Sequence, residues 1–339
     1  MFNSCSAIAV TMGDPAGIGG EITIKAWIAN HRSGKHPFFL IDDSVRIRKT
    51  ARRMNVDIPI RSIEKPELAK EVFCQALPIL DMNIAEGESG SHASQTVVRS
   101  IDRALESVLS GTASAMVTNP INKSTLYDAG FPYPGHTEYL ASQTNTKKPA
   151  VMMIATPSLR VVPATVHLSL REAIDSLSID KLVLCTSTTA KALKQDFGIT
   201  QPRIAIASLN PHAGEQGFLG REEIEIITPA INQLRAAGLN VSGPFAPDTL
   251  FYKTARKKYD VIICMYHDQA LIPVKTLDFY NGVNITLGLP IVRTSPDHGT
   301  AIDIAGTNKA NPNSLIAAIN AAGQIANKRQ DTVNARNRN

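Results

Sequence analysis

The chain has 339 residues, which is enough for two lobes or for one large α/β unit with a sizeable core. Apolar residues make up 43% and charged residues 19%, an ordinary composition for a globular protein, and no apolar run reaches the roughly 18 residues that a membrane span needs. The formal net charge is +5, but the segment "KRQDTVNARNRN" holds four basic residues against one Asp, so the rest of the chain is nearly neutral and nucleic-acid binding is not favoured.

A glycine-rich segment, "TMGDPAGIGGE" (Thr11 to Glu21), follows the first apolar run, "AIAV". Its spacing, G-x-x-x-G-x-G-G, differs from the G-x-G-x-x-G of the Rossmann dinucleotide fold, and no Gly-Lys-Ser/Thr follows as in a P-loop. We expect a tight turn between a strand and a helix, so that any cofactor here would need another architecture.

The amino-terminal stretch and the cysteines bear on location. "MFNSCSAIAVTMGD" lacks the basic region of a secretory signal peptide. The four cysteines form no C-x-x-C pair; they are Cys5, Cys74, Cys185 and Cys264. Reduced thiols and a cytoplasmic location are therefore expected.

Short apolar runs rich in β-branched residues alternate with amphipathic stretches along the chain. The runs that predict buried strands are "SAIAVTM", "PFFLID", "SAMVTNP", "AVMMIAT", "LRVVPATVH", "RIAIASLNPH" and "DVIICMYHD". Helical spacing of apolar residues predicts a helix over residues 91–111, and "GREEIEIITPAINQLRAAG" predicts another over 220–238. The alternation predicts an α/β fold with a mostly parallel sheet.

Three histidines each follow a predicted buried strand: His167 in "VVPATVH", His212 in "IAIASLNPH" and His267 in "VIICMYH". Ligands of open α/β sheets bind at this carboxyl edge. Three neutral imidazoles that meet there would suit Zn²⁺ or a similar ion with one position open for substrate. The alternative is that each is an ordinary loop histidine, since their wide spacing provides no local metal motif.

The segment "FPYPGHTEYLASQ" predicts a turn followed by a helix that begins at Glu138. His136 and Thr137 would then lie beside free helix N–H groups, which is a ready site for an anion. A plain N-cap role for Thr137 is the alternative.

Further along, Lys275, Asn284 and Arg293 recur in "PVKTLDF", "GVNITLG" and "PIVRTS". If these side chains converge, they would clamp a carboxylate or a phosphate. Cations that simply face solvent are the alternative interpretation.

Six blocks in order resemble the 4-hydroxythreonine-4-phosphate dehydrogenase family of vitamin B6 biosynthesis: "GDPAGIG", "VTNPINK", "GHTEYLA", "NPHAGEQGFLGREE", "YHDQALIPVK" and "RTSPDHGTAIDIAG". The resemblance runs from about Val10 to about Ala326. The late block "HGTAIDIAGTNKANP" is also similar to "HGSAPDIAGKGIANP" of isopropylmalate and isocitrate dehydrogenases. That similarity implies their two-lobed α/β fold, with mostly parallel sheets and a cleft between the lobes, which carries NAD without a Rossmann motif. The glycine-rich turn then corresponds to "GDGIGPE" of those relatives.

The resemblance also implies a division of the chain. A first lobe would comprise residues 1–130 with about 297–328 and would include the cofactor loop. A second lobe would comprise residues 131–296, with metal, substrate and dimer contacts, and residues 329–339 would form a flexible tail.

Site residues carried over from the family fall on matching positions of this sequence. The implied metal ligands are His167, His212 and His267, contributed by both subunits of a homodimer. The implied substrate-binding residues are His136, Thr137, Lys275, Asn284 and Arg293. The implied cofactor loop contains His298, Gly299, Asp303 and Asn311, with Asp303 facing the ribose hydroxyls. Lys275 and Arg293 would hold the anionic ends of the substrate, and the proton acceptor is open between Asp248 and Asp268.

The implied reaction is oxidation of the C3 hydroxyl of 4-phosphohydroxythreonine by NAD, aided by a divalent metal. The resulting β-keto acid would lose CO₂ and give 3-amino-2-oxopropyl phosphate. NADP stays open as an alternative to NAD, and Co²⁺ or Mg²⁺ as alternatives to Zn²⁺. A dehydrogenase of the same family for 4-phosphothreonate or 4-phosphoerythronate, or more distantly a phosphate acyltransferase, also stays open.

Overall fold

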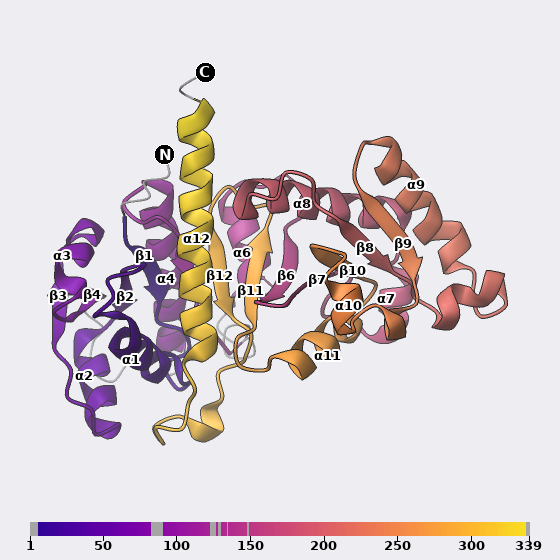
Figure 1. The fold of residues 1–339 in the computed structure, drawn as a ribbon. Helices are drawn as coiled ribbons and strands as arrows, with labels where there is room; N and C mark the ends of the chain where they lie inside the picture. The colour runs from indigo at the N-terminus through magenta and orange to yellow at the C-terminus, as the bar shows by residue number, and fades with distance from the viewer. Residues whose placement is uncertain are drawn as a thin grey trace. The chain divides into compact units, whose positions relative to one another are not determined.

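The computed structural model of the chain describes residues 6–82, 91–122, 127, 130–133, 135–147 and 149–336. It divides into two compact units: unit 1 comprises Met1–Pro149 and Leu289–Asn339, and unit 2 comprises Ala150–Gly288 (Figure 1). Each unit has its own set of mostly parallel strands and its own helices. The two-lobed α/β fold class expected from the sequence is confirmed.

The division between the units lies at other positions than the expected 130/131 and 296/297. Helix α6 (His136–Gln143) stays in unit 1, where its Tyr139 hydroxyl donates a hydrogen bond to the Asp102 carboxylate. Strand β12 (Arg293–Pro296) also belongs to unit 1, because it pairs in parallel with β5 (Met116–Val117). Backbone pairing and helix packing, which the motifs do not reveal, decide where each unit ends.

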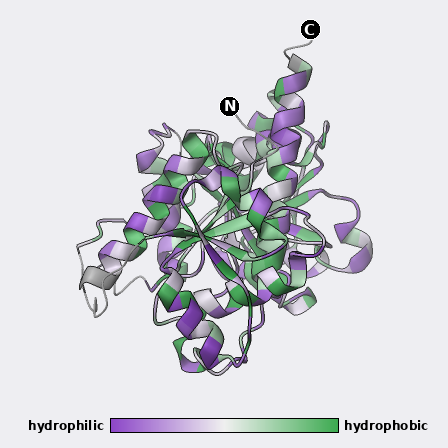
Figure 2. Cartoon of the chain, turned by 90° about the vertical axis from the view of Figure 1, so that its left-hand side faces the viewer, coloured by the Kyte–Doolittle hydropathy of each residue, from purple (hydrophilic) through white to green (hydrophobic). Residues whose placement is uncertain are grey.

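Unit 1 contains strands in the order β3-β4-β2-β1-β5-β12, and every described pairing among them is parallel. Besides β5 and β12, these strands are β1 (Ile8–Thr11), β2 (Phe38–Asp42), β3 (Ile60–Ile63) and β4 (Leu77–Asp81). Besides α6, the helical elements are α1 (Gly19–Asn30), α2 (Ser44–Arg53), η1 (Pro66–Leu68), α3 (Ala69–Phe73), α4 (Ser91–Leu109), η5 (Ile302–Ile304) and α12 (Asn313–Arg336). Figure 2 shows hydrophobic residues concentrated on the central strands and hydrophilic ones on the outer helices.

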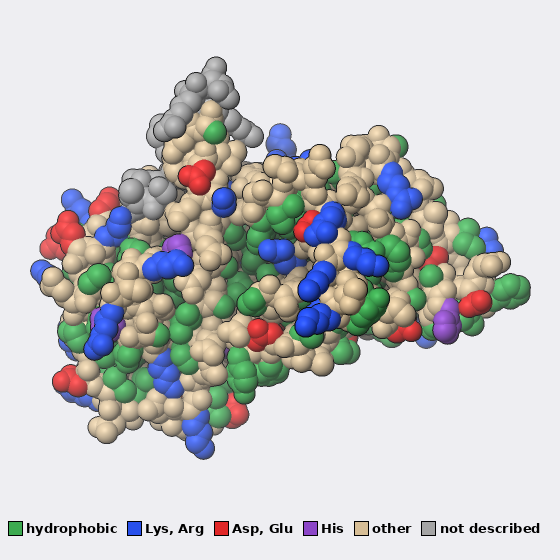
Figure 3. Space-filling view, in the orientation of Figure 1, with side chains coloured by type: hydrophobic (Ala, Val, Ile, Leu, Met, Phe, Trp, Pro, Cys, Tyr) green, Lys and Arg blue, Asp and Glu red, His purple; other side chains and the backbone are tan. Residues whose placement is uncertain are grey.

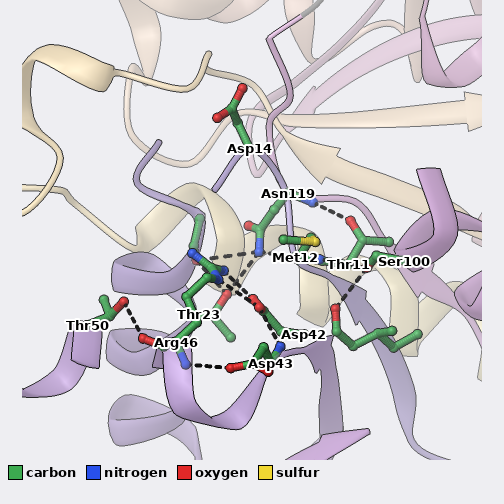
Figure 4. A network of polar contacts seen from close by, with 12 residues as sticks. Thr11, Met12, Asp14, Thr23, Asp42, Asp43, Arg46, Thr50, Ser100 and Asn119 are labelled. Carbon is green, nitrogen blue, oxygen red and sulfur yellow. Dashed lines mark hydrogen bonds and ion pairs between the residues drawn. The ribbon is translucent and has the colours of Figure 1, made fainter. Parts of the chain in front are cut away.

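The glycine-rich turn joins β1 to α1, as the sequence predicts, and its glycines are sites of close backbone approach. A Cβ at Gly13, whose φ is +71°, would lie 2.7 Å from the Cβ of Asn119. Asn119 is fully buried, and its amide donates to the Thr11 carbonyl at 2.9 Å and to the Thr23 hydroxyl at 3.0 Å (Figure 4). This amide therefore ties β1, α1 and the segment after β5 together.

Unit 2 contains strands in the order β11-β6-β7-β10-β8-β9. They are β6 (Val151–Thr156), β7 (Leu159–Pro163), β8 (Ile204–Ala207), β9 (Val241–Phe245), β10 (Val261–Cys264) and β11 (Val283–Leu287). β6 is antiparallel to both of its neighbours, whereas β7, β10, β8 and β9 run parallel. The helical elements are α7 (Leu170–Asp175), α8 (Ile179–Phe197), η2 (Pro211–Gly217), η3 (Glu223–Ile227), α9 (Thr228–Ala236), η4 (Pro247–Thr249), α10 (Lys253–Arg256) and α11 (His267–Leu277).

All seven predicted strands are present, and so is the helix predicted over 220–238, which runs from residue 222 to Ala236. Its first part is irregular: η3 is a π-helix, and it continues directly into α9 at Thr228. Pro229 lacks the amide hydrogen that would continue an α-helical ladder there. The segment expected as a tail from residue 329 is helical up to Arg336, where α12 ends; residues 337–339 lie outside the described part.

Two further expectations concern membranes and thiols. Within the described ranges, none of the helices combines the length and the apolar character that crossing a bilayer would take. Cys185 and Cys264 are buried free thiols and Cys74 is an exposed one, in agreement with reduced cysteines; Cys5 lies outside the described residues.

Candidate functional site

The three histidines singled out in the sequence all follow parallel strands of unit 2 that lie side by side. His167 comes after β7, His267 is the first residue of α11 after β10, and His212 lies in η2 after β8. Because parallel strands direct their carboxyl ends to one edge of a sheet, all three residues lie along the same edge. The position expected from the sequence is therefore correct for each of them.

Two of these histidines lie together. The ring centroids of His167 and His267 are 6.1 Å apart, and both residues line a cavity of about 260 Å³. The Nδ1 atom of His267 lies 2.7 Å from an Asp268 carboxylate oxygen. A carboxylate on one ring nitrogen fixes the orientation of an imidazole and directs the other nitrogen toward a metal ion.

The third histidine stands on an unusual turn. From His212 to Gln216, five successive residues have left-handed backbone angles, and His212 itself has a φ of 51° and is exposed. Each non-glycine residue in this conformation costs roughly 1–2 kcal/mol. Only Gly214 is free of that cost, so the turn needs support from outside.

Glu223 supplies that support. Its carboxylate is 3% exposed and accepts hydrogen bonds from the backbone N–H groups of Leu209 and Asn210, both at 2.8 Å. The Asn210 amide donates to Glu223 at 2.9 Å and to Glu222 at 2.6 Å. A Cβ on Gly214 would lie 2.6 Å from a Glu223 carboxylate oxygen, so glycine is needed there. The start of the π-helix thus anchors the turn that carries His212.

Among the described residues, no three His, Cys, Asp or Glu side chains are grouped closely enough to hold a metal ion. The structure brings the rings of His167 and His267 together, and His212 does not join them in such a group. Two imidazoles, one of them oriented by a carboxylate, nevertheless fit part of a Zn²⁺-type donor set. The remaining donor has to come from elsewhere.

Arg293 is the most deeply buried of the expected substrate-binding residues, at 4% exposure in unit 1. Its guanidinium donates to the Thr118 hydroxyl, with an Nη2–Oγ1 distance of 2.6 Å. Burial lowers the pKa of Arg293 to about 10, while the charge of Glu138 acts in the opposite direction. Arg293 therefore keeps its charge at neutral pH although it is buried.

His136 and Thr137 are the first two residues of α6, so the helix begins earlier than the expected Glu138. The N-cap is Gly135, and no side chain caps the helix there, which rules out the plain N-cap role for Thr137. Both residues contribute N–H groups to the first turn, where an anion is favoured by the helix dipole.

The other two expected substrate residues lie in unit 2. Lys275 stands in the last turn of α11, with its ammonium nitrogen 5.4 Å from the ring centroid of Phe279. Asn284 lies in β11 opposite Ile154, and its side-chain oxygen is buried with no hydrogen-bond partner among the described residues. A buried acceptor of this kind calls for a donor from outside the chain, such as a hydroxyl or an amino group.

The expected cofactor loop is an exposed segment docked on α1 within unit 1. Asp303 and Asn311 are exposed, and a Cβ built on Gly299 would meet nothing within 4 Å. The Asn311 side chain accepts a hydrogen bond from the Asn313 N–H at 2.9 Å, before α12 begins. His298 Nδ1 lies 2.9 Å from the Gly299 carbonyl. The loop thus presents polar side chains to solvent.

Three contacts hold this loop on α1. The Ile18 N–H donates to the Thr300 carbonyl at 3.0 Å, and a Cβ on Gly17 would lie 2.9 Å from that same oxygen. Glu21 accepts a hydrogen bond from the Gly306 N–H. Lys25 donates to the carbonyls of Asn308 and Ala310, at 2.9 and 2.7 Å. The glycine-rich turn and the start of α1 therefore hold the loop in place through hydrogen bonds to its backbone.

The two candidate proton acceptors differ in their surroundings. Asp268 is bonded to His267, which favours an orienting role over proton transfer. Asp248 lies in η4, after β9, and its side chain is exposed. Asp248 is therefore the candidate that is not hydrogen-bonded to an expected metal ligand.

Sequence reasoning missed four residues that position the expected site: Thr118, Glu223, Glu21 and Lys25. Thr118 and Glu223 stand inside the quoted blocks "VTNPINK" and "NPHAGEQGFLGREE", which is the signal that was available for them. Glu21 and Lys25 are spaced i, i+4 on a predicted helix, a pattern that ordinarily indicates a solvent-facing pair.

Comparison with known proteins gives consistent results. A model of the family described as pyridoxal phosphate biosynthetic protein PdxA matches residues 34–322. A 4-hydroxythreonine-4-phosphate dehydrogenase from Caulobacter vibrioides is 49% identical over 332 residues, covering 95% of this chain and 98% of its own. One from Bradyrhizobium diazoefficiens is 45% identical over 339 residues, covering 96% and 98%. The crystal structure of a 4-hydroxythreonine-4-phosphate dehydrogenase from Klebsiella pneumoniae is similar with a TM-score of 0.84 and 40% identity, covering 95% and 99%.

Proposed function

Because the chain belongs to the pyridoxal phosphate biosynthetic protein PdxA family and is an oxidoreductase, we propose that it oxidises 4-hydroxythreonine 4-phosphate at the C3 hydroxyl. The observation that carries this proposal is the set of expected ligand positions at the strand ends, with 49% identity to a dehydrogenase of that name. The reaction would take place in the cytoplasm and supply pyridoxal phosphate biosynthesis.

Substrate recognition would rest on charged and polar groups that suit a phosphorylated amino acid. The buried guanidinium of Arg293 and the first-turn N–H groups at His136 and Thr137 suit an anionic end of the substrate. Lys275 would bind the second anionic group. The unpartnered oxygen of Asn284 would accept a hydrogen bond from a hydroxyl or amino group, and so fix the orientation of the carbon chain.

A divalent cation, Zn²⁺ before Co²⁺ or Mg²⁺, would be held by His167 and His267 of one chain and by His212 of a second, and would lower the pKa of the substrate hydroxyl. NAD, or else NADP, would accept the hydride from C3, with its adenosine half on the loop of His298, Gly299, Asp303 and Asn311. Asp268 would hold the ring of His267, and Asp248 would take the hydroxyl proton. The β-keto acid product then loses CO₂, because its ketone accepts the electrons of the breaking bond.

We also propose a homodimer, which the position of His212 and the surface around the histidines support. Large apolar side chains are exposed on this part of unit 2: Leu168 at 45%, Leu170 at 57%, Phe218 at 87%, Ile272 at 63% and Phe279 at 65%. Apolar surface of this extent beside polar ligands is typical of an interface between subunits. A second copy would cover it and contribute the missing imidazole.

The test is a steady-state assay of NADH formation by the metal-loaded protein. It compares 4-hydroxythreonine 4-phosphate with 4-phosphothreonate and 4-phosphoerythronate. We expect the amino acid to have the highest kcat/KM, and His212→Ala to lose activity at least about a hundredfold. Higher kcat/KM for a sugar-acid phosphate would keep the chemistry but change the substrate. No NADH from any of the three would overturn the dehydrogenase proposal.

A further inference from the structure

A second polar cavity lies at the opposite edge of the unit 2 strands from the histidines. It has a volume of about 80 Å³ and is lined by the β6–β7 turn, by Arg160 and Arg256, and by the residues that lead into β10. The cavity is well above the roughly 10–15 Å³ that one water molecule occupies. It adjoins the amino ends of β7 and β10, whereas His167 and His267 follow their carboxyl ends, so it is separate from the candidate active site.

Arg256 is the unusual member of this lining. Its Nη1 atom is buried, and within the described ranges its guanidinium has no hydrogen-bond acceptor and no carboxylate partner. Buried donors in folded proteins are almost always paired, and an unpaired one calls for an acceptor from outside the chain. For a guanidinium, that acceptor is most often an oxyanion.

Arg160 provides a second cation at the same cavity. One of its nitrogens donates to the Asp260 carbonyl at 3.2 Å, and its guanidinium carbon lies 4.9 Å from the Phe197 ring centroid. Burial lowers the pKa of Arg160, and the charge of Asp260 only partly offsets that effect. Both of these contacts are with uncharged groups.

The charge balance around the cavity is positive. Asp260 is the carboxylate of the lining, and it is already engaged by Arg203, at 2.9 and 3.1 Å. With Arg203 included, three arginine charges meet the single carboxylate of Asp260, so the surroundings of the cavity keep a net positive charge. Figure 3 shows Lys and Arg side chains gathered on the face of unit 2 around α10, the helix that carries Lys253 and Arg256.

We propose that this cavity binds a phosphate-type oxyanion between the guanidinium groups of Arg160 and Arg256. Two planar guanidiniums match the oxygens of a tetrahedral dianion, and the enclosed polar lining strengthens those charged hydrogen bonds. The occupant is free phosphate or the phosphoryl group of a phosphate monoester, since the cavity has room for that group alone. The chain would then hold a phosphate site in addition to the one at which its substrate is proposed to bind.

The experiment has two arms on the full chain. In the first, inorganic phosphate and, separately, AMP are titrated calorimetrically into the wild type, Arg256→Gln and Lys253→Gln. Lys253 is the matched control, because it lies on the same helix, carries the same charge and does not line the cavity. In the second, crystals of the wild type are soaked in tungstate, and the anion is located by its anomalous signal.

We expect Arg256→Gln to weaken phosphate binding about 10- to 100-fold, as removal of a charged hydrogen bond does, with NADH formation retained. Lys253→Gln should stay within about twofold of the wild type, and tungstate should occupy the cavity. Binding of phosphate identifies the free ion as a sufficient ligand, and binding of AMP alone identifies a phosphate monoester. Equal affinities of the wild type and Arg256→Gln, or tungstate absent from the cavity, would overturn the proposal. The tungstate result holds even if the variant folds poorly.

Discussion

The residue that most clearly links backbone conformation to the proposed chemistry is Glu223. Its buried carboxylate holds the backbone ahead of a left-handed turn that would be unfavourable alone, and His212 is the first residue of that turn. Strain of this kind persists only where the surroundings determine it, and it is found most often at functional sites. The position of the His212 ring is thereby set by a residue that never touches it.

Replacement of Glu223 by Gln should therefore weaken metal binding without removing a ligand. The Gln side chain is uncharged and has one acceptor oxygen in place of two. It cannot accept the two backbone hydrogen bonds and the one from Asn210 as strongly as the carboxylate does. We expect about tenfold weaker Zn²⁺ binding, measured by competition with a chelator, and a loss of about 1–2 kcal/mol in the free energy of unfolding. Glu225→Gln, in the same π-helix but exposed, is the control. Unchanged Zn²⁺ affinity in Glu223→Gln would separate this carboxylate from the metal site.

Individual residues were predictable from the sequence to different extents. The histidines could be placed because each follows a buried strand, and ligands of open α/β sheets bind at the carboxyl ends of the strands. Thr118 could not be placed, because its role depends on Arg293, 175 positions later in the chain. Nor does any local pattern predict five successive left-handed residues, four of which are not glycine.

At the scale of elements, α1 and the loop that follows β12 act together. Glu21 and Lys25 hold backbone groups of the loop, while one Glu21 oxygen is buried with no partner among the described residues. A buried carboxylate that anchors a loop gives it a fixed conformation at some cost in desolvation. We infer that this contact positions the loop for the dinucleotide.

Lys25→Met should raise the KM for NAD about three- to tenfold and leave kcat within about twofold. The substitution removes the donor to two loop carbonyls but touches no reacting group, so it affects dinucleotide binding more than the chemical step. Steady-state kinetics with varied NAD, together with fluorescence titration of NADH, measure both quantities. Lys70→Met, an exposed change on α3, is the control. If the two variants have the same KM for NAD, Lys25 has no positioning role.

The starts of β8 and β10 are joined by an ion pair that makes stability depend on pH. Asp260 accepts the Arg203 N–H at 2.8 Å as well as its guanidinium. Burial raises the pKa of Asp260, but the hydrogen bonds and the charge of Arg203 outweigh it, so the pKa is lowered overall. A lowered pKa means that the stabilisation is present above the unfolded-state value of about 3.9 and is lost as the pH falls through the folded-state value.

Asp260→Asn should therefore lower the urea midpoint at pH 7, by an amount equivalent to about 1 kcal/mol. The difference from the wild type should stay constant down to about pH 5 and narrow below about pH 4. Urea unfolding at a series of pH values measures it. A difference that does not change with pH would mean that Asp260 acts through its shape and not through its charge.

Which elements were predictable follows from their composition. The seven predicted strands are continuous apolar runs, and β1, β2, β8 and β10 are buried at every position. Most of the missed strands lack such runs, and the apolar run of β4 is interrupted by Pro78. Only the two end residues of β3 are buried, β9 contains Gly-Pro, and β12 begins with Arg293. Such strands form because neighbouring strands of the sheet pair with them, and a local sequence pattern carries no information about that pairing.

At the scale of the whole molecule, the proposed metal site has a consequence that can be tested without a structure of the dimer. If His167 and His267 come from one chain and His212 from another, then each site of a dimer mixes two chains. A mixed dimer of His167→Ala and His212→Ala would contain one site with both changes and one intact site.

Mixing these two inactive variants, after dissociation and reassociation, should restore about a quarter of the wild-type activity. Random pairing makes about half of the dimers mixed, and each mixed dimer has one of its two sites intact. NADH formation before and after mixing measures the recovery, and His167→Ala mixed with His267→Ala is the control that should stay inactive. Absence of recovery in the first mixture would mean that the three ligands belong to one chain.

The discontinuity of unit 1 bears on how the chain folds as it is made. Unit 2 is one continuous segment, whereas unit 1 needs β12 and α12 from the far end of the chain to join β5. During synthesis, domains form once their residues have left the ribosome. Unit 2 can therefore complete its strands while unit 1 still lacks two of its elements. The amino-terminal part of unit 1 is therefore translated first and completed last, and until β12 arrives the edge of β5 is open to pairing with strands of other chains.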